Sequence, residues 1–261
     1  MSQIGMTQQS EEQRLMFEQE AIRIVNEAAQ QGLTLRVLGS LAFHLHCPQF
    51  HHLQKEMGRA YTDIDYAGYH TQAGKIGPFL ARLGYKEDLE VNTYFAGERL
   101  IYNNPANGLH VDIFFDKLNF CHEVNWVGRL GVDQPTLPLA EMLMEKMQIV
   151  KINEKDIIDT LMLLLEHPLG DSDDETIHIG RISKLLANDW GFWRTMTMNL
   201  EKVAHLGMEY EQLTPDEKEH LASQVELALR RINAEPKSVG WRLRSKVGDR
   251  VKWYQEVDDV S

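Results

Sequence analysis

The first regular pattern along the chain is a run of apolar positions with helical spacing. Between residues 11 and 31, Leu15, Ile22 and Val25 recur near the period of a helix, with charged residues between them. Gly32 follows as a stop signal. The pattern predicts a helix over this stretch.

Short apolar blocks then alternate with helical patterns. Residues 33–38 form a β-rich run that ends at Gly39-Ser40, and a helix is expected over 41–46. Beyond these, the pattern predicts strands over 62–66, 92–96, 100–103 and 109–115 and a helix over 72–83. Because three of these strands follow one another with only turns between them, part of the sheet must be antiparallel or mixed. The expected fold class is α/β (α+β), with a mixed sheet and flanking helices.

After Pro138 the pattern becomes helical. Asn153 is a suitable N-cap, and Thr214-Pro-Asp-Glu217 is a helix start signal with proline at the first position and glutamate at the third. Helices are predicted over 139–150, 153–166, 177–187, 190–205 and 215–232, with an acidic loop over 167–174. The chain is therefore expected to comprise a catalytic α/β domain, residues 1–136, and a helical domain, residues 137–261.

Composition narrows the class of protein. A hydrophobic fraction of 43% in 261 residues is enough for a core and argues against wholesale disorder. No stretch approaches the roughly 18 to 20 apolar residues of a membrane span. The polar N-terminus resembles neither a signal nor a transit peptide, and the two cysteines fit a reducing compartment. We expect a cytoplasmic protein without membrane partners. Its net charge of −12 argues against nucleic-acid binding through the overall field.

The clearest candidate chemistry is Thr62-Asp63-Ile64-Asp65. Residues two apart on a strand project from the same face, so Asp63 and Asp65 would present their carboxylates together while Ile64 points into the core. Two close carboxylates repel each other, and a divalent cation relieves that repulsion. Oxygen ligands favour Mg²⁺ over zinc. The alternative is a pair of solvated carboxylates close to a turn.

A third carboxylate, Asp112, lies in the otherwise apolar strand His110-Val-Asp-Ile-Phe-Phe115. An unpaired buried carboxylate would be costly, so Asp112 needs a partner, and a metal shared with Asp63 and Asp65 would be one. Three such aspartates could hold two Mg²⁺ ions that activate a hydroxyl and neutralise a triphosphate.

Upstream of the aspartates, Gly39-Ser40 is expected where a strand turns into a helix. Glycine allows close approach of the backbone to a phosphate, the helix N-terminus offers N–H groups, and serine adds a hydroxyl donor. A Gly-Ser pair alone is common, but it becomes specific when D-x-D and a strand aspartate follow.

Gly39-Ser40, Asp63-Ile-Asp65 and Asp112 together resemble the nucleotidyltransferase superfamily with the polymerase-β-type fold. The run from Lys146 to Asp159, with its Lys-Asp-x-x-Asp segment, resembles the AbiEii/AbiGii-type toxin nucleotidyltransferases of toxin–antitoxin and abortive-infection systems. The resemblance covers roughly residues 33–165.

The resemblance implies transfer of NMP from an NTP to an acceptor, tRNA or protein, and an antitoxin protein as a possible partner. It implies that Asp63, Asp65 and Asp112 bind Mg²⁺ or Mn²⁺ and form the catalytic set. Gly39, Ser40 and Lys146 would bind the nucleotide, and Asp159 would position the lysine or the acceptor.

The chain also departs from the family pattern. Thr62 abuts Asp63 directly, and Lys151 and Lys155 stand where arginines are common, which weakens bidentate phosphate contacts. Two other functions therefore stay open: nucleotidyl transfer to a small antibiotic-type molecule, and a non-catalytic binding module with the same fold. Lys146 could also be a snorkelling helix lysine and Asp159 an ordinary paired carboxylate.

The segment from Lys237 to Lys252 carries six basic residues and one acidic residue, with Trp241, Trp253 and Tyr254 interleaved or adjacent. Basic and aromatic residues together can bind a nucleic-acid backbone and stack on bases. The alternative is an amphipathic terminal helix that docks on the acidic body of the protein.

Overall fold

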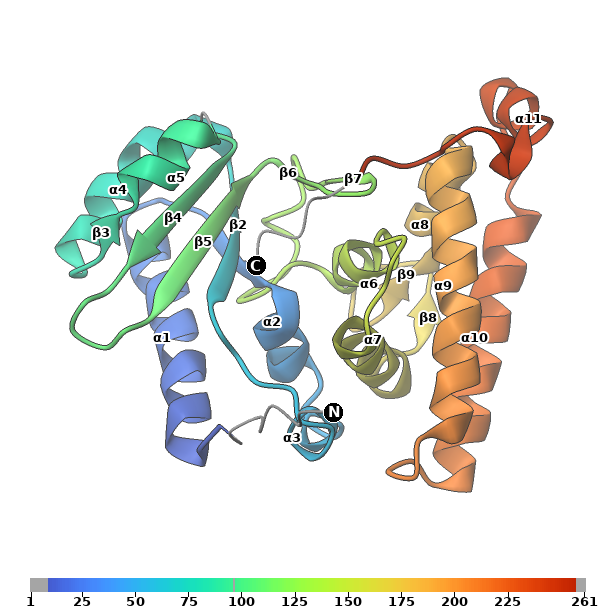
Figure 1. Cartoon of the computed structure of the whole chain (residues 1–261), viewed down its shortest axis with the longest axis horizontal. Helices are drawn as coiled ribbons and strands as arrows, with labels where there is room; N and C mark the ends of the chain where they lie inside the picture. The colour runs from blue at the N-terminus through green and yellow to red at the C-terminus, as the bar shows by residue number, and fades with distance from the viewer. Residues whose placement is uncertain (1–8, 96, 257–261) are drawn as a thin grey trace, which may run out of the picture. The chain divides into compact units, whose positions relative to one another are not determined.

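The computed structural model describes residues 9–95 and 97–256 (Figure 1). They form two compact units: unit 1 contains the residues up to Lys117 together with Trp126–Leu137, and unit 2 contains Leu118–Asn125 and everything from Pro138 onward. The expected domain boundary at 136/137 stays a prediction; the units differ from it in the placement of residues 118–125 and of Leu137. Among the described residues, no helix is both long and apolar enough to cross a bilayer.

Unit 1 is a mixed sheet with helices. Its strands are β1 (Leu35–Leu38), β2 (Ile64–Gly68), β3 (Lys86–Glu87), β4 (Arg99–Asn103) and β5 (His110–Phe115). Its helices are α1 (Glu11–Gln30), α2 (Gly39–His46), α3 (His52–Glu56), α4 (Ala73–Arg82), α5 (Leu89–Tyr94) and a 3₁₀ turn over His70–Gln72. In this described part the strand order is β1-β2-β5-β4-β3, with β2 and β5 parallel and the other pairs antiparallel. The predicted mixed α/β fold is confirmed.

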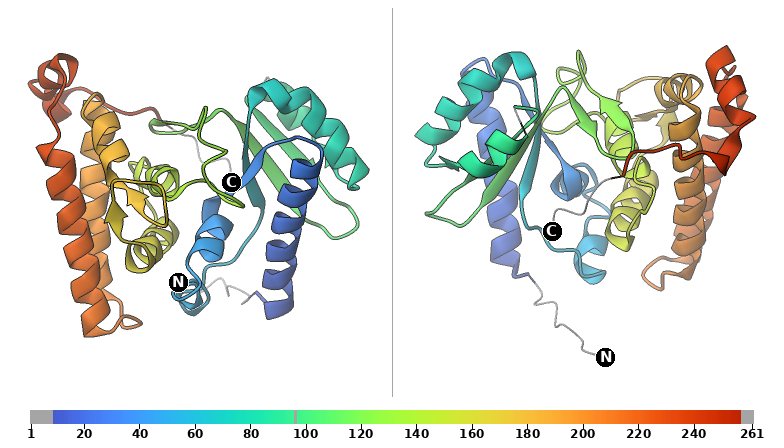
Figure 2. Two further views of the ribbon diagram at one scale, coloured as in Figure 1. Left: turned by 180° about the vertical axis from the view of Figure 1, so that it is seen from behind. Right: turned by 45° about the horizontal axis from the view of Figure 1, so that its top comes forward.

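One face of the sheet is covered by α1 and α4, which lie over it when the molecule is seen from behind (Figure 2, left). The hydroxyl of Tyr66 on β2 donates to the α1 carbonyl of Ala21 at 3.3 Å, and Gly77 of α4 lies against the hydroxyl of Tyr102 on β4. Strand residues alternate between faces, so Asp65 and Asp112 belong to the opposite face.

The first helix forms as predicted, but its buried stripe is different. Ser10 and Gln13 form a capping box at its start. The core-facing residues are Phe17, Ala21, Ile24, Val25 and Ala28, whereas Leu15 of the predicted stripe is 48% exposed. On this face Phe17 contacts the ring of Tyr61, at 5.9 Å between centroids, and the Ala21 carbonyl accepts from Tyr66.

The predicted strand over 92–96 is wrong, because residues up to Tyr94 belong to α5. Asp88 caps this helix by accepting from the backbone N–H of Val91. The buried Asn92 side chain then accepts from the backbone N–H of Ile101 and donates to its carbonyl, at 2.7 and 3.3 Å. The Asn92 side chain therefore satisfies the N–H of Ile101, whereas the Ile101 carbonyl also accepts from the backbone N–H of Asp88 at 3.0 Å.

Unit 2 is helical apart from short strands. Its helices are α6 (Leu139–Met147), α7 (Glu154–Glu166), α8 (Ile179–Leu186), α9 (Trp190–Glu209), α10 (Pro215–Ala234) and α11 (Val239–Ser245), with a 3₁₀ turn over Gly248–Arg250. The strands are β6 (Lys117–Asn119), β7 (Glu123–Asn125), β8 (Leu169–Gly170) and β9 (Ile177–His178). The predicted caps are confirmed: Asn153 caps α7, and Thr214 and Glu217 form the capping box of α10.

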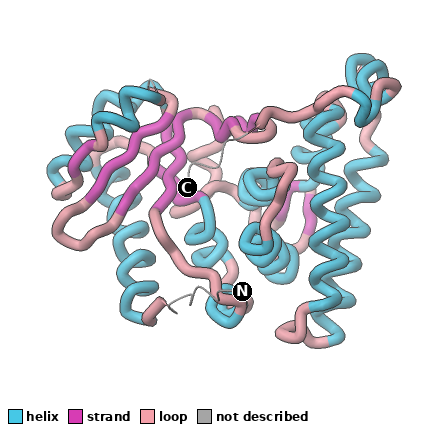
Figure 3. The backbone as a smooth tube through the Cα atoms, viewed as in Figure 1, coloured by secondary structure: helices cyan, strands magenta, loops and turns pink. Residues whose placement is uncertain are grey.

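The core of unit 2 surrounds α6, every residue of which is buried. Met142, Met144 and Met147 lie fully inside, as flexible side chains that fill gaps between helices. The long helices α9 and α10 run side by side and pack against each other (Figure 3). The N-terminal end of α9 packs against α11 and carries Trp190 and Trp193, which are discussed below.

Candidate active site

A row of residues across four strands places two of the predicted aspartates side by side. In the register of the sheet, Leu38 of β1 pairs with Asp65 of β2, Asp65 with Asp112 of β5, and Asp112 with Ile101 of β4. Because β2 and β5 are parallel neighbours, the two carboxylates belong to the same face of the sheet. Asp65 is half-buried and Asp112 is 4% exposed.

Asp63 immediately precedes β2 and is exposed, whereas Ile64 is fully buried as predicted. The Thr62 hydroxyl donates to the Asp63 carboxylate at 3.0 Å. The charge of Asp63 acts on Asp112, where it raises the pKa. The three predicted aspartates are therefore close enough for their charges to interact.

The partner of Asp112 is Arg99 on β4, a residue that the sequence did not single out. The Arg99 Nε donates to both carboxylate oxygens of Asp112, at 2.8 and 2.7 Å, and its terminal nitrogen completes a bidentate contact. The guanidinium also lies over the rings of Phe95 and Phe114, at 5.1 and 5.0 Å from their centroids. The charges of Asp65 and Asp63 act on it as well. Arg99 is thus the cation of the three-aspartate cluster.

Burial is the largest influence on Asp112 and raises the pKa of its carboxyl group. The hydrogen bonds and charge of Arg99 act in the opposite direction, and the neighbouring charge of Asp63 raises the pKa further. The net direction is upward, so Arg99 compensates only part of the cost of this buried carboxylate.

The predicted Gly39-Ser40 turn adjoins the aspartates. Gly39 has a φ of +71°, and a Cβ at this position would collide with the Asp65 carboxylate. The N-cap of α2 is Leu38, which offers no side-chain cap, and Ser40 is the second residue of the helix. The start of α2 therefore lies directly beside Asp65, and the predicted contact of this turn with a phosphate stays a prediction.

Replacing Gly39 by alanine is expected to destabilise the protein for two reasons. A side chain is strained at this positive φ, and the new Cβ would collide with the Asp65 carboxylate. Gly58 is a matched control: its φ is +75°, and nothing lies within 4 Å of a Cβ built there. Gly58→Ala should lower the free energy of unfolding by about 1 kcal/mol. Gly39→Ala should cost at least about 1 kcal/mol more in urea unfolding. Equal costs for both variants would contradict the close approach to Asp65.

Lys146 and Asp159 are brought together within unit 2. The Lys146 Nζ lies 3.0 Å from an oxygen of Asp156 and 3.3 Å from one of Asp159. Asp159 is fully buried and Lys146 is 9% exposed. The lysine is therefore not a snorkelling surface residue but the cation of a buried ion pair between α6 and α7. Its predicted contact with a nucleotide stays a prediction.

Whether the aspartates suit a divalent cation can be judged from Arg99. Carboxylate oxygens are the ligands that Mg²⁺ prefers. The three aspartates already interact with one positive charge, that of the Arg99 guanidinium. As the side chains stand, no three acidic, histidine or cysteine groups of the described chain could hold a metal ion together. Both oxygens of Asp112 are bound to Arg99. The carboxylate oxygens are of the kind that Mg²⁺ prefers, but those of Asp112 are taken by Arg99 in this structure.

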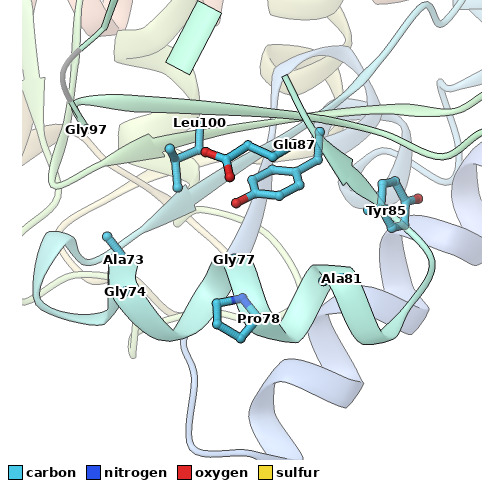
Figure 4. A pocket seen from close by; sticks show the side chains of 10 residues that line it. Ala73, Gly74, Gly77, Pro78, Ala81, Tyr85, Glu87, Gly97 and Leu100 are labelled. Atoms are coloured by element: carbon cyan, nitrogen blue, oxygen red, sulfur yellow. The ribbon is translucent and has the colours of Figure 1, made fainter. Parts of the chain in front are cut away.

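A cavity of about 540 Å³ lies on the opposite face of the sheet, between α4 and β4 (Figure 4). Ala73, Gly74, Gly77 and Ala81 of α4 leave this space because their side chains are small, and the Glu87 side chain lies across from them. Leu100 and Tyr102, which line the cavity, alternate along β4 with Arg99 and Ile101. The cavity is therefore separated from the aspartates by the sheet itself.

Comparison with known proteins gives limited results. No family model and no curated protein matches the chain. One similar solved structure is titled as the solution structure of antibiotic-resistance factor ANT(2'')-Ia, at 13% identity and a TM-score of 0.42 over 67% of this chain and 95% of that one. Another is titled as an antigenic nucleotidyltransferase-like protein from Paracoccidioides brasiliensis, at 12% identity and a TM-score of 0.39 over 85% and 94%. Scores this low carry no assignment of substrate, cofactor or residue roles.

Proposed function

We propose that the protein is a Mg²⁺- or Mn²⁺-dependent nucleotidyltransferase that moves NMP from an NTP to an acceptor. The observation that carries the proposal is the in-register pair Asp65 and Asp112, with Asp63 beside them and the Gly39-Ser40 turn against Asp65. A divalent ion bound to these carboxylates would neutralise the triphosphate and lower the pKa of the attacking hydroxyl.

The chain's own residues take separate roles in this proposal. Gly39 lets the backbone approach the triphosphate, because it carries no side chain at the point where α2 begins. Ser40 adds a hydroxyl donor. Arg99 holds Asp112 in place before the nucleotide binds and can pair with a phosphate after releasing it.

For the acceptor we propose RNA, in line with the resemblance to AbiEii/AbiGii-type toxins, for which tRNA or a protein is the implied acceptor and an antitoxin the implied partner. Support comes from unit 2, where basic and aromatic side chains gather around α11. Lys146 and Asp159 would contribute to nucleotide binding, as that resemblance implies.

Binding of Mg²⁺–NTP is expected to raise the thermal unfolding midpoint. A ligand at 100 times its Kd stabilises the folded state by about 2.7 kcal/mol. Each of the four NTPs would be tested with Mg²⁺ by differential scanning fluorimetry, with Asp63→Asn/Asp65→Asn as the matched variant. A shift in the wild type alone supports the proposal. The absence of a shift with all four would favour the non-catalytic binding module instead.

A further inference from the structure

A second, aromatic cavity lies wholly within unit 2. It has a volume of about 320 Å³, at the small end of the range of roughly 300 to 1,000 Å³ for ligand pockets. Its walls are the side chains of Trp190, Trp241 and Trp253, which come from the start of α9, from α11 and from the segment after it. Three indoles around one small space favour a flat aromatic ligand.

These walls are held by specific contacts. The Trp253 indole N–H donates to the Thr195 hydroxyl at 3.0 Å, and its ring meets that of Trp190 edge to face at 6.2 Å between centroids. A Cβ on Gly191 would lie 2.5 Å from the Trp253 carbonyl oxygen, so glycine is needed for this approach. Trp241 meets Trp193 in the same edge-to-face manner, at 5.0 Å. The cavity is therefore preformed.

Polar groups at the cavity match the edge of a nucleobase. The Trp241 Nε1 is buried and donates to no acceptor among the described residues. Asp189 and Asn188 also line the cavity. The Asp189 carboxylate already caps α9 through the backbone N–H of Phe192. It would repel a phosphate but can still accept from an exocyclic amino group.

Exposed charges of both signs lie at the cavity and along α11 and the segment after it: Asp189 lines the cavity, and Asp249 pairs with Arg194. Arg242, Lys246 and Arg250 are exposed and form no ion pair within the part of the chain that the structure describes. In a chain of net charge −12, these cations make the segment from Arg242 to Arg250 locally basic, and Arg244 of the same segment lines the cavity. Their charge would attract the phosphates of a strand whose base enters the cavity.

The alternative interpretation of the C-terminal segment is an amphipathic helix that docks by its apolar face. The helix α11 does not dock in this way. Val239 and Leu243 are 63% and 59% exposed. The helix instead contacts α9 through Trp241 and through Arg244, whose guanidinium lies 4.4 Å from the centroid of the Trp190 ring. The side of α11 that faces α9 builds the cavity.

We propose that this cavity binds a base of single-stranded nucleic acid, with Arg244 at its wall and the exposed cations Arg242, Lys246 and Arg250 of the same segment attracting the adjacent phosphates. The proposal rests on the proposed function only in taking RNA as the natural source of that strand. Its test contains neither NTP nor metal, so failure of binding leaves nucleotidyl transfer untouched, and failure of transfer leaves binding untouched.

The experiment is a titration of the full chain with fluorescein-labelled rA8, followed by anisotropy at several salt concentrations, with unlabelled rA8 quenching tryptophan fluorescence. Trp241→Ala should weaken binding by about 5- to 150-fold, because loss of one base–aromatic stack has that effect. Trp241→Phe, which keeps an aromatic face, should lie between this variant and the wild type. Leu243→Ala on the same helix is the matched control and should bind like the wild type.

Binding that weakens with salt and is lost in Trp241→Ala supports the site, and comparison of rA8 with dA8 identifies RNA or DNA as the source. Three results would overturn it: no binding by the wild type at low salt, full binding by a folded Trp241→Ala, or tighter binding of a duplex of equal length. Circular dichroism and the unfolding midpoint report whether each variant is folded.

Discussion

Asp65→Asn is expected to lower nucleotidyl transfer by about 100-fold or more while the protein stays folded. Asp65 is the carboxylate that joins the parts of the site, because it pairs in register with Asp112 and lies against Gly39. Asparagine has nearly the same shape but lacks the charge that a divalent cation requires. Loss of several kcal/mol of charge stabilisation in the transition state corresponds to a fall in kcat of about 100- to 1,000-fold.

Glu90→Gln is the matched control for this variant. It also removes one negative charge from unit 1, but Glu90 is an exposed residue of α5. Its activity should equal that of the wild type. If Asp65→Asn retains more than about a tenth of the wild-type rate, the aspartates do not form the catalytic set.

Arg99→Met is expected to destabilise the protein strongly in the absence of metal and to make it sensitive to Mg²⁺. The side chain of Asp112 is 6% exposed, and its ion pair with Arg99 is bidentate. Removal of one partner of such a pair costs about 3–5 kcal/mol, because the other charge stays buried. Mg²⁺ would then restore part of this loss, since no arginine competes for Asp112.

Urea unfolding with and without Mg²⁺ measures both effects. Arg181→Met is the control, because the Arg181 Nε pairs at 2.7 Å with Glu141, a fully buried carboxylate in unit 2. This variant should lose comparable stability but gain no more from Mg²⁺ than the wild type does. Equal Mg²⁺ responses in all three proteins would show that Arg99 does not stand in for a metal ion.

The elements around the aspartates could be predicted because each is a local pattern. A buried strand followed by glycine and serine, and alternation around Ile64, need no knowledge of distant residues. Asp112 was correctly expected to need a partner, since an unpaired carboxylate in an apolar strand is costly. The predicted partner was a metal, whereas the structure supplies Arg99.

Arg99 was missed because its role depends on the register between two strands. The pairing of Arg99 with Phe114 and of Ile101 with Asp112 places the arginine diagonally across from the aspartate. One signal could have found it. Arg99 immediately precedes one predicted strand, and the strand that follows along the chain carries the buried opposite charge of Asp112. The aromatic cavity of unit 2 is built from residues up to 63 positions apart, Trp190, Trp241 and Trp253. No local sequence pattern contains that information.

The most direct measurement compares NTPs labelled at the α-phosphate with NTPs labelled at the γ-phosphate, incubated with the full chain, Mg²⁺ and total RNA. Nucleotidyl transfer through Asp63, Asp65 and Asp112 predicts that RNA acquires the α-label but not the γ-label, and that Asp65→Asn transfers neither. Label from the γ-position alone, or α-labelling that persists in Asp65→Asn, would contradict the assignment of this site.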